Sequence, residues 1–233
     1  QERKQQHMNV PHNTNAKTLT VTGKGRISAS PDLVSLSCTV SAKNKNYSDL
    51  TASEAEKTSE LISALAGVGF EEKDIKTSDF SLDTEYENCS APDNKWVRQF
   101  AGYSLRREIK LEFELDPQRL NDVINAVTSC KKADPAFHIS FTVKDKDGLS
   151  DLLLEKAVKD AAHKAGVIAA ASEMTLGDII NISYGADRFS FDSPTLFRGA
   201  AEGAESLRCA AKINLVPEDV VSETDVTVTY HLT

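Results

Sequence analysis

The chain has 233 residues and a formal net charge of -8 at pH 7, and 40% of its residues are hydrophobic, which suffices for one large core or two small ones. It has no long run of lysine or arginine, so its composition argues against nucleic-acid binding. No window approaches the roughly eighteen continuous apolar residues of a membrane-spanning helix, and no transmembrane segment is predicted.

The beginning of the chain is polar and aperiodic, and we predict a flexible tail over residues 1–16. The first residue is Gln1 rather than methionine, which fits a mature terminus left after removal of an export signal. An arbitrary boundary would give the same start. We expect an exported protein whose residues 17–233 fold as a single domain.

The first predicted strand, residues 19–29, alternates apolar and polar side chains and carries Gly23 and Gly25 on its apolar face. A phosphate-binding loop would need its glycines to open a helix, whereas the alternation continues past Gly25. Two residues without side chains on an inward face instead predict close packing, either against a helix or at a β-bulge. The glycine pair is therefore assigned to packing.

Strand and helix periodicities follow one another along the rest of the chain. The predicted strands cover residues 19–29, 33–42, 80–87, 101–115, 137–143, 176–185 and 220–232. The predicted helices cover residues 48–67, 117–129 and 147–174. The order ββα-ββα-βα-ββ predicts an α+β fold, with a mainly antiparallel sheet and three helices packed on it.

Two residues in the middle of the chain depart from the pattern. Trp96 is the single tryptophan and lies in a predicted loop. Arg107 falls on the apolar side of the strand at residues 101–115, where an unpaired charge is costly. Arg107 is therefore expected either to pair with an acidic side chain or to face a subunit contact near a sheet edge. Both residues are candidate interface residues.

Residues 186–217 lack one lasting periodicity and are predicted to be a long excursion that orders mainly against another chain. Within it, residues 207–215 alternate as a strand would, and residues 198–212 also fit a short helix. Phenylalanine and arginine, both enriched at buried contacts, gather in this segment. The candidate interface residues here are Phe189, Phe191, Phe197 and Arg198. The alternative is a local hydrophobic cover over the same subunit.

The chain shows no motif that carries known chemistry. Its cysteines form no CxxC pair, and no zinc-protease, nucleophile-elbow, dinucleotide or calcium-loop motif is present. Cys38 lies on an apolar strand face and is expected in the core, whereas Cys89 and Cys209 fall in predicted loops. Disulfide pairing of Cys89, Cys130 and Cys209 cannot be read from spacing. No cofactor, metal ligand or catalytic residue is predicted.

Six stretches in order resemble the SIMPL-domain family, a bacterial group that includes oxidative stress defence and outer-membrane immunogenic proteins. They begin with "VTGKGRISASPDLVSLSCTVSA", include "GYSLRREIKLEF" and "AVKDAAHKAGVIAAASEMTLGDIINIS", and end with "DVTVTYHL". The resemblance implies an exported, envelope-associated protein without a known cofactor, with homo-oligomers suggested for some relatives. It supplies no catalytic residues.

Three functional hypotheses follow. The leading one is a non-enzymatic, exported protein that self-associates through strand edges or through the excursion around Phe189 to Phe197. It has a protective or scaffolding role in the periplasm or cell envelope, including oxidative stress defence, and contacts an envelope protein partner. The second is a monomeric ligand-binding or adaptor module with a groove beside Gly23 and Gly25 and the Trp96 loop as its lid. The third is a thiol-based redox protein that uses Cys89 or Cys209.

Overall fold

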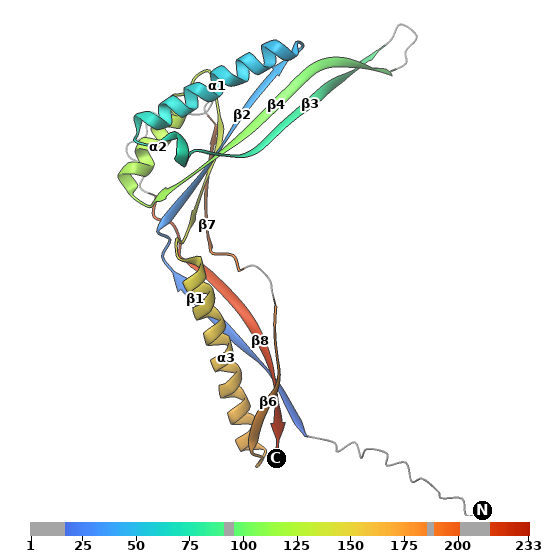
Figure 1. Ribbon diagram of the computed structural model, residues 1–233, viewed down its shortest axis with the longest axis vertical. Coiled ribbons are helices and arrows are strands. Elements are labelled where there is room, and N and C mark those ends of the chain that lie inside the picture. The colour runs from blue at the N-terminus through green and yellow to red at the C-terminus, as the bar shows by residue number, and fades with distance from the viewer. Residues whose placement is uncertain (1–16, 91–95, 186–188, 201–214) are drawn as a thin grey trace, which may run out of the picture. The chain divides into compact units, whose positions relative to one another are not determined.

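The computed structural model describes residues 17–90, 96–185, 189–200 and 215–233 (Figure 1). Within these ranges the chain forms eight strands, three α-helices and one short 3-10 helix at Glu72–Asp74. The described residues separate into two compact units: those before residue 28, within 147–190 and after 221 form one, and those within 28–146 and 191–221 form the other. The single domain at residues 17–233 stays a prediction, and the tail at residues 1–16 lies outside the described residues.

The smaller unit is a three-stranded sheet with one helix packed on one of its faces. The strand order is β1-β8-β6. Its elements are β1 (Thr18–Ala29), α3 (Lys146–Ala171), β6 (Leu176–Tyr184) and β8 (Val220–Leu232). Small alanines of α3 pack on valines and a tyrosine of the sheet, and the buried cluster consists of Val21, Ala157, Ala161, Ala165, Val226, Val228 and Tyr230. The small side chains let the helix backbone lie close to the sheet.

The larger unit is a five-stranded antiparallel sheet of order β3-β4-β2-β5-β7. Its strands are β2 (Leu33–Asn44), β3 (Lys76–Ser90), β4 (Trp96–Glu114), β5 (Ala136–Thr142) and β7 (Asp192–Ala200). The helices α1 (Tyr47–Gly67) and α2 (Pro117–Ser129) pack on one face of this sheet. The core lies between the helices and the alternate residues of the central strands, including Val34, Leu36, Leu61, Val123 and Ile139.

The predicted fold class and element order are confirmed, with one strand more than the sequence indicated. That strand is β7, which forms within the segment expected to be an excursion and pairs with β5 of the same chain, for example Phe197 opposite Ile139. The sequence did not predict β7 because its alternation is weak and is interrupted by Pro194 and Gly199, which are both poor strand formers. Of the short helix considered at residues 198–212, residues 198–200 belong to β7 instead, and the rest of it, like residues 207–214 of the alternative strand, lies outside the described residues.

Candidate functional site

Gly23 and Gly25 lie directly against the backbone of α3. A Cβ atom added at Gly23 would stand 2.1 Å from the carbonyl oxygen of Ala157 and 2.3 Å from the amide nitrogen of Ala161. A Cβ atom at Gly25 would stand 2.1 Å from the carbonyl oxygen of Leu153. A packed helix, not a bulge or a phosphate, therefore uses the space that the two glycines leave. The helix backbone also occupies the position where a ligand groove was considered.

Polar side chains of α3 reach the free edge of β1 in the same unit. The amide of Lys24 donates to Asp160 Oδ2 at 2.6 Å, and Lys164 Nζ donates to the carbonyl oxygen of Thr22 at 3.0 Å. Lys156 Nζ donates to the carbonyl oxygen of Arg26 at 3.3 Å. These bonds satisfy backbone groups that an edge strand otherwise leaves open.

The opposite edge of this sheet, β6, is unlike β1. Every residue from Asp178 to Tyr184 is exposed, including the large apolar side chains of Ile179, Ile180, Ile182 and Tyr184. No proline or lysine stands on β6, although both residues commonly protect edge strands from pairing. The β6 edge is thus an apolar surface that can take a further strand.

In the larger unit, β3 and β4 form a long hairpin that continues beyond the end of β2 (Figure 1). The pairing of β2 with β4 ends at Asn44 opposite Tyr103, whereas β3 remains paired with β4 as far as Ser90 opposite Trp96. In the outer half of the hairpin, β3 and β4 therefore pair only with each other, and β3 is the edge strand of the sheet. Its side chains receive less cover than those of the central strands.

Aromatic side chains line one face of this hairpin. Tyr47, Tyr103, Phe100 and Tyr86 form a chain of edge-to-face contacts, with ring centroids 6.0, 5.1 and 5.9 Å apart in that order. The guanidinium of Arg98 lies 4.3 Å from the Tyr86 ring centroid. We use the term aromatic arm for the exposed apolar residues of this region, which are Tyr47, Phe80, Leu82, Tyr86, Trp96 and Phe100. Trp96 is 76% exposed and Tyr86 is 46% exposed, so the arm presents its rings to solvent.

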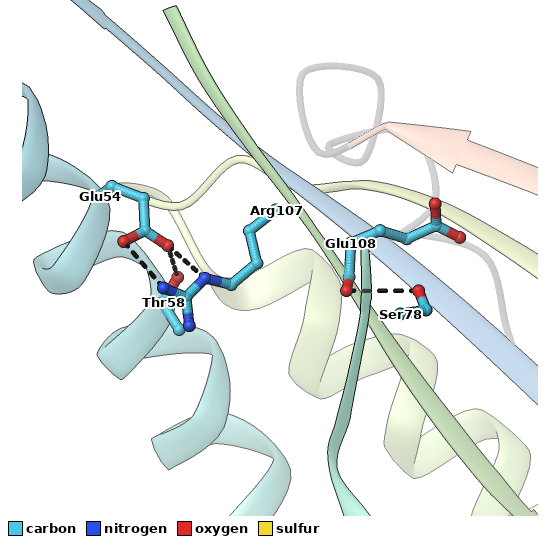
Figure 2. A network of polar contacts seen from close by, with 5 residues as sticks. All are labelled: Glu54, Thr58, Ser78, Arg107 and Glu108. Carbon is cyan, nitrogen blue, oxygen red and sulfur yellow. Dashed lines mark hydrogen bonds and ion pairs between the residues drawn. The ribbon is translucent and has the colours of Figure 1, made fainter. Parts of the chain in front are cut away.

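A buried ion pair holds the base of the arm to α1 (Figure 2). Arg107 Nε lies 2.7 Å from Glu54 Oε1, and Arg107 Nη2 donates to Glu54 Oε2 at 3.3 Å. Thr58 Oγ1 donates to Glu54 Oε1 at 2.7 Å, and Glu54 is 4% exposed. The Arg107 guanidinium also lies 5.1 Å from the Phe80 ring centroid. Of the two expectations for Arg107, the structure shows the pairing with an acidic side chain.

The other candidate interface residues do not gather into one patch. Trp96 and Arg107 stand on β4, next to one edge of the larger sheet, whereas Phe197 and Arg198 stand on β7, the other edge. Phe191 is buried within its own chain, and Phe197 is half-buried with its ring centroid 5.9 Å from that of Phe137. Phe189 is half-buried. Trp96 and Arg198 are exposed.

Sequence reasoning missed Phe80, Tyr86 and Phe100 as parts of a surface. Alternation identified Phe80 and Tyr86 as one face of a strand, and a strand face is normally a core face. Here that face of β3 is left largely uncovered, and both side chains are exposed. The surplus of aromatic residues around a tryptophan-bearing hairpin is the signal that could have indicated the arm.

The two cysteines whose side chains are described lie in the core of the larger unit. The core position expected for Cys38 is confirmed, and Cys130 is also buried. Burial raises the pKa of Cys38 from its ordinary value of 9.0 to about 12 and that of Cys130 to about 11. The Cys89 side chain and Cys209, on which the redox hypothesis depends, lie outside the described residues.

The raised pKa values predict slow thiol chemistry. A Cys89→Ser/Cys209→Ser variant at pH 8 is expected to react with an aromatic disulfide reagent at a much lower rate when native than when unfolded in urea, because the thiolate is the nucleophile. Absorbance of the released thiolate measures both rates. Above pH 9 the stability of the variant should fall, because unfolded thiols ionise there while the folded ones stay protonated. Equal native and unfolded rates would contradict the buried assignment.

Across the described ranges, no three histidine, cysteine, aspartate or glutamate side chains come together as a metal site requires. None of the helices formed by the described residues is both long and apolar enough to cross a membrane.

Comparison with known proteins finds a family whose model matches most of the chain. The model of the family described as "SIMPL: Protein of unknown function (DUF541)" matches residues 19–231. The chain is similar to the 26 kDa periplasmic immunogenic protein of Brucella melitensis biotype 1, with 21% identity over 175 residues, which is 73% of this chain and 67% of that protein. The 26 kDa periplasmic immunogenic protein of Brucella abortus strain S19 is similar to the same extent.

Proposed function

Because this chain belongs to the SIMPL family, we propose that it is an exported, periplasmic protein that self-associates through its aromatic arm and acts as a protective or scaffolding component of the cell envelope. The names of the two Brucella relatives support the periplasmic location. The proposed role is a non-enzymatic one, in which the surfaces of the protein rather than a catalytic centre carry the function. A part in oxidative stress defence and contact with an envelope partner belong to the same proposal.

The observation that carries self-association is the exposure of the aromatic arm. Soluble proteins rarely leave contiguous apolar patches uncovered, and rings of tyrosine, tryptophan and phenylalanine beside arginine are typical of interface centres. The side chains of the arm are held in place by the contacts among Tyr47, Tyr103 and Phe100 and by the Glu54–Arg107 pair at its base. A partner therefore meets a surface that loses little conformational freedom on binding.

A triple variant tests this proposal. The wild-type chain is expected to show a mass above that of the monomer in sedimentation velocity, increasing from low to high micromolar concentration. Tyr86→Ser/Trp96→Ser/Phe100→Ser removes three exposed rings and should weaken the association about tenfold or more, since a buried aromatic anchor contributes roughly 2 kcal/mol. Circular dichroism before each run shows that the variant is folded.

The matched control is Val167→Ser/Ile168→Ser, which removes two exposed apolar side chains from α3. It should associate as the wild type does. The proposal fails if the wild type is a monomer at every concentration, or if the triple variant and the wild type associate equally. Weakening by both variants to the same degree would point to general hydrophobicity and also count against the arm.

A further inference from the structure

The face of the larger sheet opposite α1 and α2 carries a polar trough. Along β2 the side chains on this face are the small hydroxyls of Ser35, Ser37 and Thr39, because Val34, Leu36 and Cys38 alternate with them toward the helices. In the sheet register Ser37 lies between Lys110 of β4 and His138 of β5, and His138 lies opposite Arg198 of β7. Short side chains in the middle and long ones on both sides make the surface concave.

Two hollows along this trough share Ser37 and His138. One has a volume of about 400 Å³ and is lined by Arg106 and Glu108 on one side and Arg198 on the other. The other, of about 410 Å³, is lined by Lys110, Glu112 and Asp192 and also by Lys146. The two hollows are therefore neighbours along β2.

Arg106 and Arg198 are the unusual members of the lining. Both are exposed, and neither guanidinium forms an ion pair or hydrogen bond with the residues that the structure describes. The charges of Lys110 and Glu112, by contrast, meet at 2.9 Å. Guanidinium groups recognise carboxylates by paired hydrogen bonds, and the two that line this hollow outweigh its one carboxylate, Glu108, so the hollow attracts an acidic group. This charge arrangement stands out in a chain whose net charge is -8.

The dimensions of the trough favour an extended peptide. Three strand spacings of about 4.8 Å place β4 and β7 about 14 Å apart, which leaves room for one extended chain between their side chains. Arg106 and Lys110 are four residues apart on β4, a separation of about 14 Å in a strand. Acidic residues four positions apart in an extended peptide have the same separation, so both can meet a cation at once.

We propose that this trough binds an extended acidic peptide segment, with one carboxylate between Arg106 and Arg198 and a second that takes the place of Glu112 at Lys110. The hydroxyl groups of Ser35, Ser37 and Thr39 and the imidazole of His138 provide hydrogen bonds to the peptide backbone along the floor. The site lies on the face opposite the helices and needs neither the aromatic arm nor self-association, so it goes beyond the function proposed above.

The test uses a fluorescein-labelled heptapeptide of sequence Ser-Glu-Ser-Ser-Ser-Glu-Ser and the full chain, with binding followed by fluorescence anisotropy at low salt. We expect saturable binding that weakens as salt rises, because the contacts are solvent-exposed charges. Arg106→Gln/Arg198→Gln should weaken binding about tenfold or more. The same peptide with glutamine in place of both glutamates should bind at least tenfold more weakly.

The matched control is Arg26→Gln/Lys159→Gln, which removes two exposed positive charges from the other unit and so keeps the same net charge as the test variant. It should bind the peptide as the wild type does. Three outcomes would overturn the proposal: no saturable binding, equal weakening in the test and control variants, or displacement of the peptide by inorganic phosphate at equimolar concentration. Phosphate displacement would indicate a simple anion site rather than a peptide site.

Discussion

Gly23→Ala is expected to lower the free energy of unfolding by about 3 kcal/mol or more. The added methyl group would stand 2.1 Å from a backbone oxygen and 2.3 Å from a backbone nitrogen of α3, positions that no side-chain rotation can relieve. The whole helix must move away from β1, which opens the contacts of Ala157, Ala161 and Ala165. Urea unfolding followed by circular dichroism measures the change.

Two further variants make this prediction specific. Gly166→Ala, on α3 where a Cβ meets nothing within 4 Å, should instead stabilise the protein by about 0.5–1 kcal/mol, because alanine is the better helix former. Ala161→Gly combined with Gly23→Ala should not restore stability, since the closest contacts are with the helix backbone rather than the Ala161 methyl group. A Gly23→Ala protein as stable as the wild type would show that α3 does not pack as described.

Arg107→Met is expected to lower the free energy of unfolding by about 3 kcal/mol. The substitution leaves the Glu54 carboxylate, which is 4% exposed, without its cationic partner, so a buried charge stays uncompensated. Thr58 continues to donate one hydrogen bond to that carboxylate, which is not enough to replace the pair. Urea unfolding followed by circular dichroism measures the loss.

The double variant Glu54→Met/Arg107→Met separates pairing from packing. Replacing both charges by apolar groups of similar length should recover most of the loss, to within about 1 kcal/mol of the wild type, because the desolvation penalty disappears together with the attraction. If the two single changes simply add in the double variant, the ion pair does not couple α1 to β4 and the account of the arm's base is wrong.

Much of the fold follows from local pattern. The alternation of Val34, Leu36, Cys38 and Val40 identifies a strand with one buried face, and the structure buries all four. Pro117 marks a helix start, and in the structure the Asp116 carboxylate before it accepts hydrogen bonds from the amides of Gln118 and Arg119. What pattern could not give was the assignment of strands to two sheets, since the partner of a strand is chosen by tertiary packing.

The candidate site was less accessible to sequence reasoning. Arg107 was recognised as an out-of-pattern charge, yet its partner Glu54 lies fifty-three positions earlier on a helix, and long-range pairing leaves no local trace. Phe191 gave the signal of an interface aromatic but is buried in its own chain. The trough could not be predicted because it depends on how the strands pair. Ser37, His138 and Arg198 become neighbours only through the pairing register of β2, β5 and β7.

The two edge strands of the smaller sheet differ in how readily they can pair with a further strand. The lysines and the aspartate of α3 close the β1 side by binding its backbone, so strand addition there would first have to break those bonds. In the described part of the chain, no α3 side chain binds the backbone of β6 in this way. The side chains of Ile180 and Ile182 are exposed and apolar, which favours pairing with another strand. Pairing with a strand of another molecule would therefore begin at β6 rather than at β1.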